Sequence, residues 1–182
     1  IEGGEYGHSW CYQNTNRNAI RFFKALGSPI GKKSSQELNI PSWIYLNKTF
    51  ENEFFSSLMG SEGGIPKVHS HGNRLNTFDF AITGENGLES NRIEFLTNIK
   101  KFLEKNKIQT GEIIQRSIKG NENSILYRVL ISTKFENVVN YSKNCKLNYC
   151  KYKRDKLTNT INSFRSIKKK KYNDLIREGY GA

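Results

Sequence analysis

The feature that most restricts how this chain can fold is a predicted helix that ends in an acid followed by two glycines. Phe50, Phe54 and Leu58 recur at helical spacing, so a helix is expected over residues 48–60. An acid at a helix C-terminus lies near the negative end of the helix dipole, which is mildly unfavourable. Some other group must therefore stabilise Glu62, and a divalent cation is one candidate.

Small residues on one face of this helix would let a second helix pack closely against it. Ser57 and Ser61 are four residues apart and share a face, where a bulky side chain would hold a partner away. Gly60 is expected at the same interface, and the two glycines after Glu62 are expected to form the C-cap. The alternative is an ordinary helix that has this cap and a solvated Glu62, and the residues alone fit both.

Hydrophobic periodicity divides the rest of the chain into helices and hairpins. From residue 48 the expected order is αββαββα, which predicts an α+β fold: a four-stranded antiparallel sheet with helices on one face and the other face free for a ligand. The other expected elements are a strand at 8–16, a helix at 17–26, a turn-rich connector at 27–43, a hairpin at 64–84, a helix at 89–108, a hairpin at 112–133 and a helix from 135.

The charge of the chain is concentrated near its C-terminus. The net charge is +12, and residues 141–182 hold 12 basic and 3 acidic residues, or +9. Such a patch attracts polyanions, most commonly nucleic acid. The lysine run 168–171 taken alone equally fits a solvated tail. Tyr149, Tyr152 and Phe164 suggest that the part before this run packs on the domain.

No apolar run is long enough to cross a membrane, and the first residues lack the order of a signal peptide. An intracellular protein with no membrane partner is expected, in a compartment that the sequence does not specify. Cys11, Cys145 and Cys150 are odd in number and lack the close pairing of a zinc site, so three reduced thiols are expected.

Residues 55–63, FSSLMGSEG, resemble the motif of the LAGLIDADG homing endonuclease family, with Glu62 at the metal-binding acid. Residues 22–44 and 140–153 are similar to segments that flank the second motif in intein-type members, and the resemblance covers most of residues 17–165. It implies an αββαββα unit whose sheet forms a saddle on double-stranded DNA, and metal-dependent cleavage of both strands at a long site.

This sequence departs from the family pattern in two ways. Gly60 stands at an often acidic position, and Ser57 replaces a helix-contact glycine. Active members also need two motifs, and this chain shows one. The second would come from a homodimer partner or from a missing N-terminal half of a two-motif protein, such as an intein or an intron-encoded endonuclease, and the fragment is slightly favoured. Residues 1–47 would then end a preceding unit, 48–165 form the endonuclease domain and 166–182 form a basic tail.

The chemistry that the resemblance implies is phosphodiester hydrolysis with Mg²⁺, bound by one acid from each motif helix and by DNA phosphates. His69 and His71 could form a zinc pair, but no cysteine lies near them in sequence, so DNA contacts are favoured. The family also places a basic residue near the catalytic water, for which Lys67, Lys143 and Lys146 are candidates.

Alternate side chains of a sheet in the major groove read base edges. The residues expected to contact DNA in this way are Lys67, His69, His71, Arg74, Asn76, Gln115, Arg116, Lys119 and Arg128.

Two other functions fit the sequence. One is a cleavage-inactive descendant that binds RNA or DNA, as an intron-splicing maturase would, which the single softened motif favours. The other is a basic structural domain, which requires the motif match to be accidental.

Overall fold

The computed structural model of the chain describes residues 2–3, 7–8, 15–70 and 74–177, and the side chains of 15–70 and 74–174. Near the N-terminus, β1 (Glu2–Gly3) and β2 (Gly7–His8) form a short antiparallel pair. Most of the strand expected at 8–16 lies outside the described residues.

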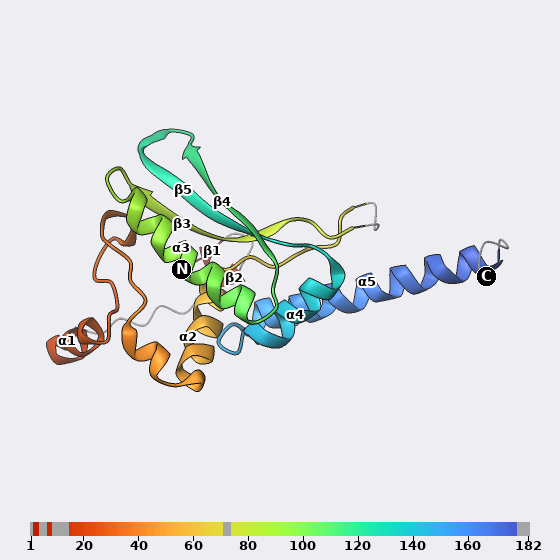
Figure 1. Cartoon of the computed structure of the whole chain (residues 1–182), viewed down its shortest axis with the longest axis horizontal. Coiled ribbons are helices and arrows are strands. Elements are labelled where there is room, and N and C mark those ends of the chain that lie inside the picture. Colours follow the sequence, from red (N-terminus) through yellow and green to blue (C-terminus); the bar gives the residue numbers. More distant parts are fainter. Residues whose placement is uncertain (1, 4–6, 9–14, 71–73, 178–182) are drawn as a thin grey trace.

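The remaining elements follow the expected order in most of the chain. The helices and strands are α1 (Arg17–Ala25), the short 3-10 helices η2 (Lys33–Ser35) and η3 (Ser42–Leu46), α2 (Lys48–Ser61), β3 (Phe78–Glu85), α3 (Glu89–Lys105), β4 (Thr110–Ile118), β5 (Asn121–Ile131), α4 (Phe135–Cys145) and α5 (Lys151–Arg177). Strands β3, β5 and β4 form an antiparallel sheet in that spatial order (Figure 1). The α+β class and the antiparallel sheet are therefore confirmed.

The described residues form three regular strands in this sheet, not the expected four. The segment that leads from α2 to β3 makes two isolated bridges instead of a ladder, Gly63 with Phe80 and Val68 with Leu75. It still bonds locally, because the N–H of Asn76 donates to Lys67 O at 2.8 Å. Pro66 has no N–H to donate, which is one physical reason why a regular strand does not form there. The turn expected at Gly72 and Asn73 lies outside the described residues.

One face of the sheet is buried beneath helices. The buried side chains of β3 and β5 alternate along each strand, at Phe78, Phe80, Tyr127, Val129 and Ile131. Helix α3 contacts all three strands, and α2, α3 and α4 lie on the same side of the sheet (Figure 1). The helices also pack on one another, for example through the stacked rings of Phe55 in α2 and Phe102 in α3, 3.9 Å apart. The core therefore lies between the sheet and this helical layer.

Helix α1 stands apart from this core (Figure 1). Asn16 caps its N-terminus through its side-chain oxygen, and the helix is amphipathic, but none of its residues is buried. Ile20 and Phe23, on its apolar stripe, are 42% and 54% exposed. In the described part of the chain this apolar stripe is not covered.

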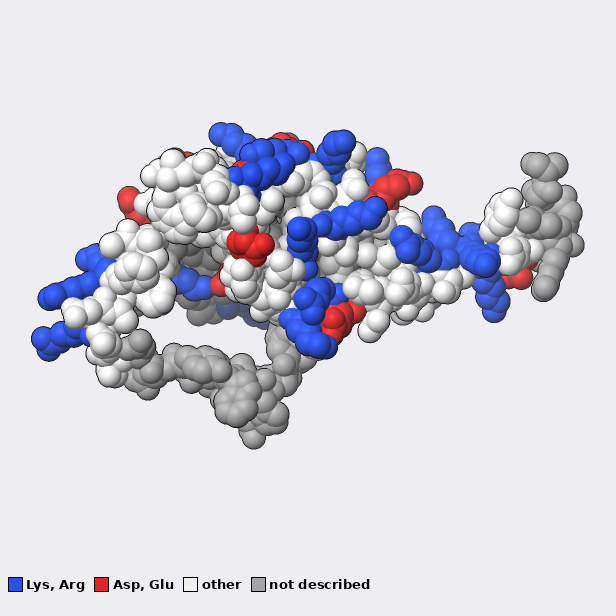
Figure 2. All heavy atoms as spheres, turned by 90° about the horizontal axis from the view of Figure 1, so that it is seen from below, with Lys and Arg blue, Asp and Glu red and all other residues white. Residues whose placement is uncertain are grey.

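Helix α5 was not among the expected elements. Its first half packs on the domain through Leu157, Ile161 and Phe164, which are buried. Its second half projects from the domain (Figure 1), and Figure 2 shows lysine and arginine side chains along this projection. The basic tail expected from residue 166 is therefore helical as far as Arg177.

Lys153 of α5 explains how α2 can end in an acid. The residue is buried, with 8% of its surface exposed, and its Nζ donates to the carbonyl oxygens of Ser61 at 2.9 Å and Gly63 at 2.8 Å. The last carbonyls of a helix have no partner within the helix, and a cation there complements the dipole. Burial lowers the pKa of Lys153, and the nearby Cys150 and Glu62 partly offset this.

Replacing Lys153 with methionine should destabilise the fold. The substitution keeps most of the buried stem but leaves the two carbonyls without their charged donor, so a loss of about 1–3 kcal/mol in the free energy of unfolding is expected. Urea denaturation measures it. Lys151→Met is the matched control, because the side chain of Lys151 is 80% exposed and pairs with Asp155 on the surface. Equal stability of the two variants would contradict a capping role for Lys153.

Candidate functional site

Helix α2 divides the expected motif between two faces. Phe55, Ser56, Met59 and Gly60 are buried in the chain's own core. Ser57, Ser61 and Glu62 are exposed, and Phe50 on the same side is 47% exposed. The small residues at 57 and 61 therefore lie on an open face of the helix, with the acid at its end.

Gly60 was expected at the interface with a second helix, but the structure buries it within this chain. A Cβ atom on Gly60 would lie 3.2 Å from Cys150 Cβ, so this glycine makes room for the turn between α4 and α5 within the same unit. It does not lie on the open face with Ser57 and Ser61.

The two glycines after Glu62 serve close packing. Their φ angles are not positive, so neither forms the expected left-handed cap. A Cβ on Gly63 would lie 2.7 Å from Met59 O, and one on Gly64 would lie 3.0 Å from Asp79 O. The glycines let the chain turn from α2 directly against β3.

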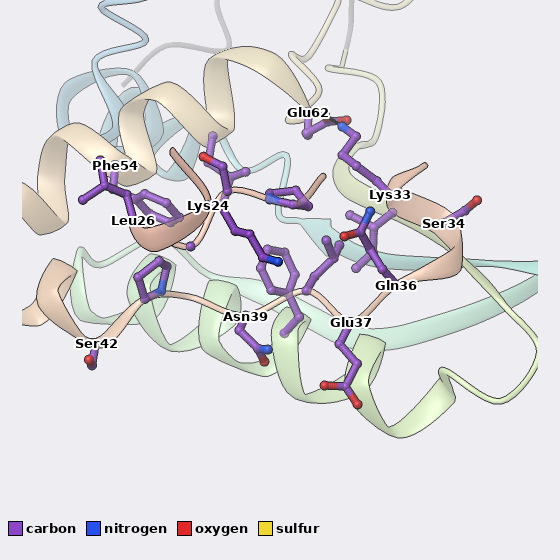
Figure 3. A pocket seen from close by; sticks show the side chains of 18 of the residues that line it. Lys24, Leu26, Lys33, Ser34, Gln36, Glu37, Asn39, Ser42, Phe54 and Glu62 are labelled. Carbon is purple, nitrogen blue, oxygen red and sulfur yellow. Dashed lines mark hydrogen bonds and ion pairs between the residues drawn. The ribbon is translucent and has the colours of Figure 1, made fainter. Parts of the chain in front are cut away.

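Glu62 lies at the edge of a cavity of about 1000 Å³ beside α2. Phe54, Leu58 and Glu62 line it from successive turns of α2, and the connector, residues 27–43, lines the opposite side. Figure 3 shows Lys33 reaching from the connector toward Glu62. Its Nζ lies 2.5 Å from Glu62 Oε1, and the two side chains are 60% and 36% exposed. The acid is thus paired with Lys33, while Lys153 bonds the backbone carbonyls on either side of it.

The connector is fixed on the domain by Arg92 of α3. This side chain is fully buried, and its Nη2 donates to the carbonyl oxygens of Lys33 at 2.9 Å, Ser34 at 3.3 Å and Gln36 at 2.8 Å. Its Nε donates to Thr83 O of β3 at 3.1 Å. Arg92 therefore ties the backbone that carries Lys33 to the sheet.

The described residues offer few ligands for a divalent cation such as Mg²⁺. Among the described residues no group of three or more His, Cys, Asp or Glu side chains gathers as a metal site. Mg²⁺ in phosphoryl chemistry is commonly held by one or two carboxylates, with waters and substrate phosphates as the other ligands. Glu62 is one exposed carboxylate of this kind, and it is paired with Lys33. His69 is half-buried, and His71, its expected zinc partner, lies outside the described residues.

The lysines that bond at the end of α2 are not the expected candidates. Lys33 and Lys153 lie there, whereas Lys143 and Lys146 are exposed at the end of α4. Lys67 is also exposed, five residues beyond Glu62. In the sequence Lys33 and Lys153 look like solvated lysines, and only their folded positions single them out. The catalytic roles expected of Lys67, Lys143 and Lys146 stay predictions.

The strand register sorts the residues expected to contact DNA. Gln115 pairs with Tyr127 and therefore points to the helix-covered face, not to the open one. Ile114 pairs with Arg128, and Arg116 pairs with Leu126, which places both arginines on the open face. Arg128 forms an ion pair with Asp79 of β3. Arg74, Asn76 and Lys119 are exposed, in keeping with a surface role.

Two further expectations concern the whole chain. In the part of the chain that the structure describes, no helix is long and apolar enough to span a membrane. Cys145 and Cys150 carry free thiols, and burial raises the pKa of Cys145 to about 12. Cys11 lies outside the described residues.

Two proteins of Methanocaldococcus jannaschii are similar to this chain. It is 28% identical over 169 residues to a replication factor C small subunit, and 30% identical over 99 residues to the DNA-directed RNA polymerase subunit Rpo1N. The matches cover 92% and 53% of this chain but only 9% and 7% of those proteins. No family model and no solved structure matches the chain. The chain is thus similar to a small part of each of two much longer proteins.

Proposed function

We propose that this chain is one half of a site-specific double-strand DNA endonuclease of the LAGLIDADG homing type. The half becomes active when a second motif helix joins it, and it hydrolyses phosphodiester bonds with a divalent cation, for which Mg²⁺ is the natural choice. The second motif comes from the missing N-terminal half of a two-motif protein or from a second copy of the chain.

The main support for this proposal is that α2 buries one face in its own domain and leaves the other face open. A helix that needed only its own domain would expose polar, solvated residues on its free face. The free face of α2 instead holds Phe50, Ser57 and Ser61, at spacings of seven and four residues, and the half-buried Phe54 lies at the edge of this face beside the cavity. Such a seam of aromatic and small side chains suits close packing against another helix. The acid at the end of that seam would meet its counterpart there.

The place of the similar segments within two longer proteins supports an intein as the form of this endonuclease. Two proteins with different names, in one organism, each contain a segment similar to this chain that makes up less than a tenth of their length. A coding element that inserts into unrelated genes would produce this pattern. Homing endonucleases are elements of this kind.

The open face of the sheet and the cationic regions support DNA as the substrate. Arg116 and Arg128 lie on the open face, Lys119 stands at the β4–β5 turn, and the projecting part of α5 adds lysines 168–171. The segment at 63–69 is bridged to β3 at Gly63 and would widen the DNA-facing saddle beyond β3 without forming a regular fourth strand.

In the proposed mechanism the residues of this chain provide a ligand for the cation and hold that ligand in place. Glu62 contributes one carboxylate ligand, and Lys153 holds the end of α2 so that this carboxylate faces the partner helix. A divalent cation held there would supply an activated water and would stabilise the charge that builds up on the phosphate. Gly63 and Gly64 keep the site against β3, so that the acid and the DNA-facing sheet stay in fixed relation.

A cleavage-inactive nucleic-acid-binding protein, of the maturase type, is the second candidate. The observation that favours it is the ion pair of Glu62 with Lys33, which satisfies the acid without a metal. The two candidates share the fold and the DNA-binding surface and differ in whether Glu62 takes part in chemistry.

Replacing Glu62 with glutamine should abolish cleavage and leave DNA affinity almost unchanged. The substitution keeps the shape and removes the charge, so the rate should fall by about 10²-fold or more, as for a group that acts in the transition state. The measurement is cleavage of a plasmid that carries the cognate site, with Mg²⁺ and then Ca²⁺, in the complete two-motif assembly.

The control for this experiment is Glu37→Gln, because Glu37 is an exposed acid that lines the same cavity. Full cutting by Glu62→Gln would refute its catalytic assignment. No cutting by the wild type would favour the binding protein.

Replacing Ser57 with leucine should disrupt pairing of the motif helices. Because Ser57 is exposed, the free energy of unfolding should change by less than about 0.5 kcal/mol, whereas association through α2 and cleavage should be lost. Light scattering measures association. Ser163→Leu makes the same change at an exposed position of α5 and should alter neither property. If Ser57→Leu also altered neither, the interface would lie elsewhere.

DNA binding by the chain should weaken steeply as salt rises. Each neutralised phosphate contributes a slope of about −0.9 to log K against log salt concentration, because counterions are released. Fluorescence anisotropy of a labelled duplex, titrated at several salt concentrations, gives this slope. An affinity that did not depend on salt would remove DNA from the proposal.

A further inference from the structure

One acid and one arginine form an ion pair on the open face of the sheet. Arg128 of β5 lies opposite Ala81 of β3 in the strand register, and Asp79 precedes Ala81 by two residues, so Asp79 and Arg128 are diagonal neighbours on one face. The Nε of Arg128 donates to Asp79 Oδ2. The side chains of Arg128 and Asp79 are 25% and 19% exposed, so both stay within reach of a ligand on this face.

The pair lies among apolar side chains in the middle of the sheet. Arg128 is on β5, which lies between the other two strands of this sheet, and its cross-strand partners are Ala81 and Ile114. Leu126 and Leu130 share its face, two residues away along the same strand. In a sheet that enters the major groove, side chains at the middle of the face meet base edges. Arg128 is therefore placed for a base and not for the phosphate backbone.

Neither stability nor general DNA affinity explains the acid of this pair. Partly exposed ion pairs add little to stability. A carboxylate on a DNA-facing surface also repels phosphates, which lowers the affinity for any duplex. What Asp79 does supply is a fixed position for the guanidinium group. The N–H of Gly64 donates to the Asp79 carbonyl oxygen at 2.6 Å and so fixes the backbone that carries this acid.

The ion pair leaves the outer end of the guanidinium group free to bind. An arginine side chain has five N–H donors in one plane, and Asp79 takes the one on Nε. Within the described residues, the two Nη groups of Arg128 make no hydrogen bond. Guanine presents two acceptors, O6 and N7, in the major groove, and a bidentate arginine is the commonest specific contact to it.

We propose that Arg128 reads a guanine in the recognition site and that Asp79 is its positioning residue. The proposal rests on the proposed function and deepens it, because it names a base that the sheet selects. Both Nη groups of Arg128 donate to guanine, and Asp79 holds the guanidinium plane from the Nε side, so less side-chain entropy is lost when DNA binds. Gly64, which bonds Asp79, follows Glu62 by two residues, so this base pair lies near the cleavage centre.

The first test is the base preference of the full chain for double-stranded DNA. A library of duplexes with a randomised centre is bound in the presence of Ca²⁺, and the enriched duplexes are sequenced. The wild type should select guanine at one position. Arg128→Lys keeps the charge and loses the fork of donors, so this preference should fall by about five- to 150-fold. The salt dependence of binding should not change, because the charge is kept.

The second test is Asp79→Asn, which keeps the shape of the side chain and removes its charge. The guanine preference at the same position should fall by about two- to tenfold, the scale of ordering one long side chain. The affinity for a random duplex should not fall, because a negative charge is lost. A purely structural ion pair would alter the urea midpoint and leave the base preference as it is. Asp79→Ala, which removes the acceptor outright, is the second variant if Asp79→Asn does not fold.

Two matched controls make the same exchanges elsewhere on the open face. Glu85→Gln removes another acid of β3, one that pairs with Lys32 at 2.6 Å. Arg116→Lys makes the arginine exchange at an exposed position of β4. Neither should change the preference at the position that Arg128 selects.

The outcomes separate this proposal from the proposed function. If the wild type cleaves DNA but folded Arg128→Lys keeps the guanine preference, this proposal is overturned and the endonuclease stands. A guanine preference that depends on Arg128 and Asp79, in a protein that never cleaves, would support this proposal while the endonuclease activity fails. A wild type without any base preference would overturn the proposal. A folded Asp79 variant with the full wild-type preference would overturn the positioning role.

Discussion

The rest of the structure depends on how α2 ends. Lys153 joins the last helix of the chain to the carbonyls of Ser61 and Gly63, and so brings together segments that are 90 residues or more apart in sequence. With this end fixed, the glycines can pass directly to β3, and Glu62 is left facing outward. The ammonium group of Lys153, which is distant in sequence, therefore bonds carbonyls that have no partner within the helix.

The sequence predicted the parts of the fold that depend on local periodicity. The amphipathic patterns of α2 and α3 and the hairpin of β4 and β5 lie where they were expected, because one face of each repeats its apolar residues. Helix α5 was missed because its polar positions outnumber its apolar ones, and Leu157, Ile161 and Phe164 are buried only by packing against the domain. The fourth strand was expected from the hairpin pattern of residues 64–84, but Pro66 and close packing at Gly63 and Gly64 work against a ladder there.

In the candidate site, too, sequence spacing predicted the residues that lie close together in the chain and missed those that folding brings together. Glu62, Ser57 and Ser61 are neighbours in sequence, and their spacing on a helix was enough to place them on one side. Lys33, Arg92 and Lys153 come from three separate elements, and no spacing rule connects them. Gly60 was assigned to the wrong face because a small residue permits close approach on whichever side it points, and only the contact with Cys150 shows which side that is.

The projecting half of α5 arranges its charges in a definite pattern. Successive residues of a helix point about 100° apart, so the four lysines 168–171 cannot all reach one strand of phosphates. Lys168 and Lys171, three residues apart, share a side, and Lys168 lies 5.5 Å from the ring centroid of Phe164. Lys169 and Lys170 point to other sides. A segment that is already helical would lose little backbone entropy on meeting a polyanion, and its lysines would face phosphates on more than one side of the helix.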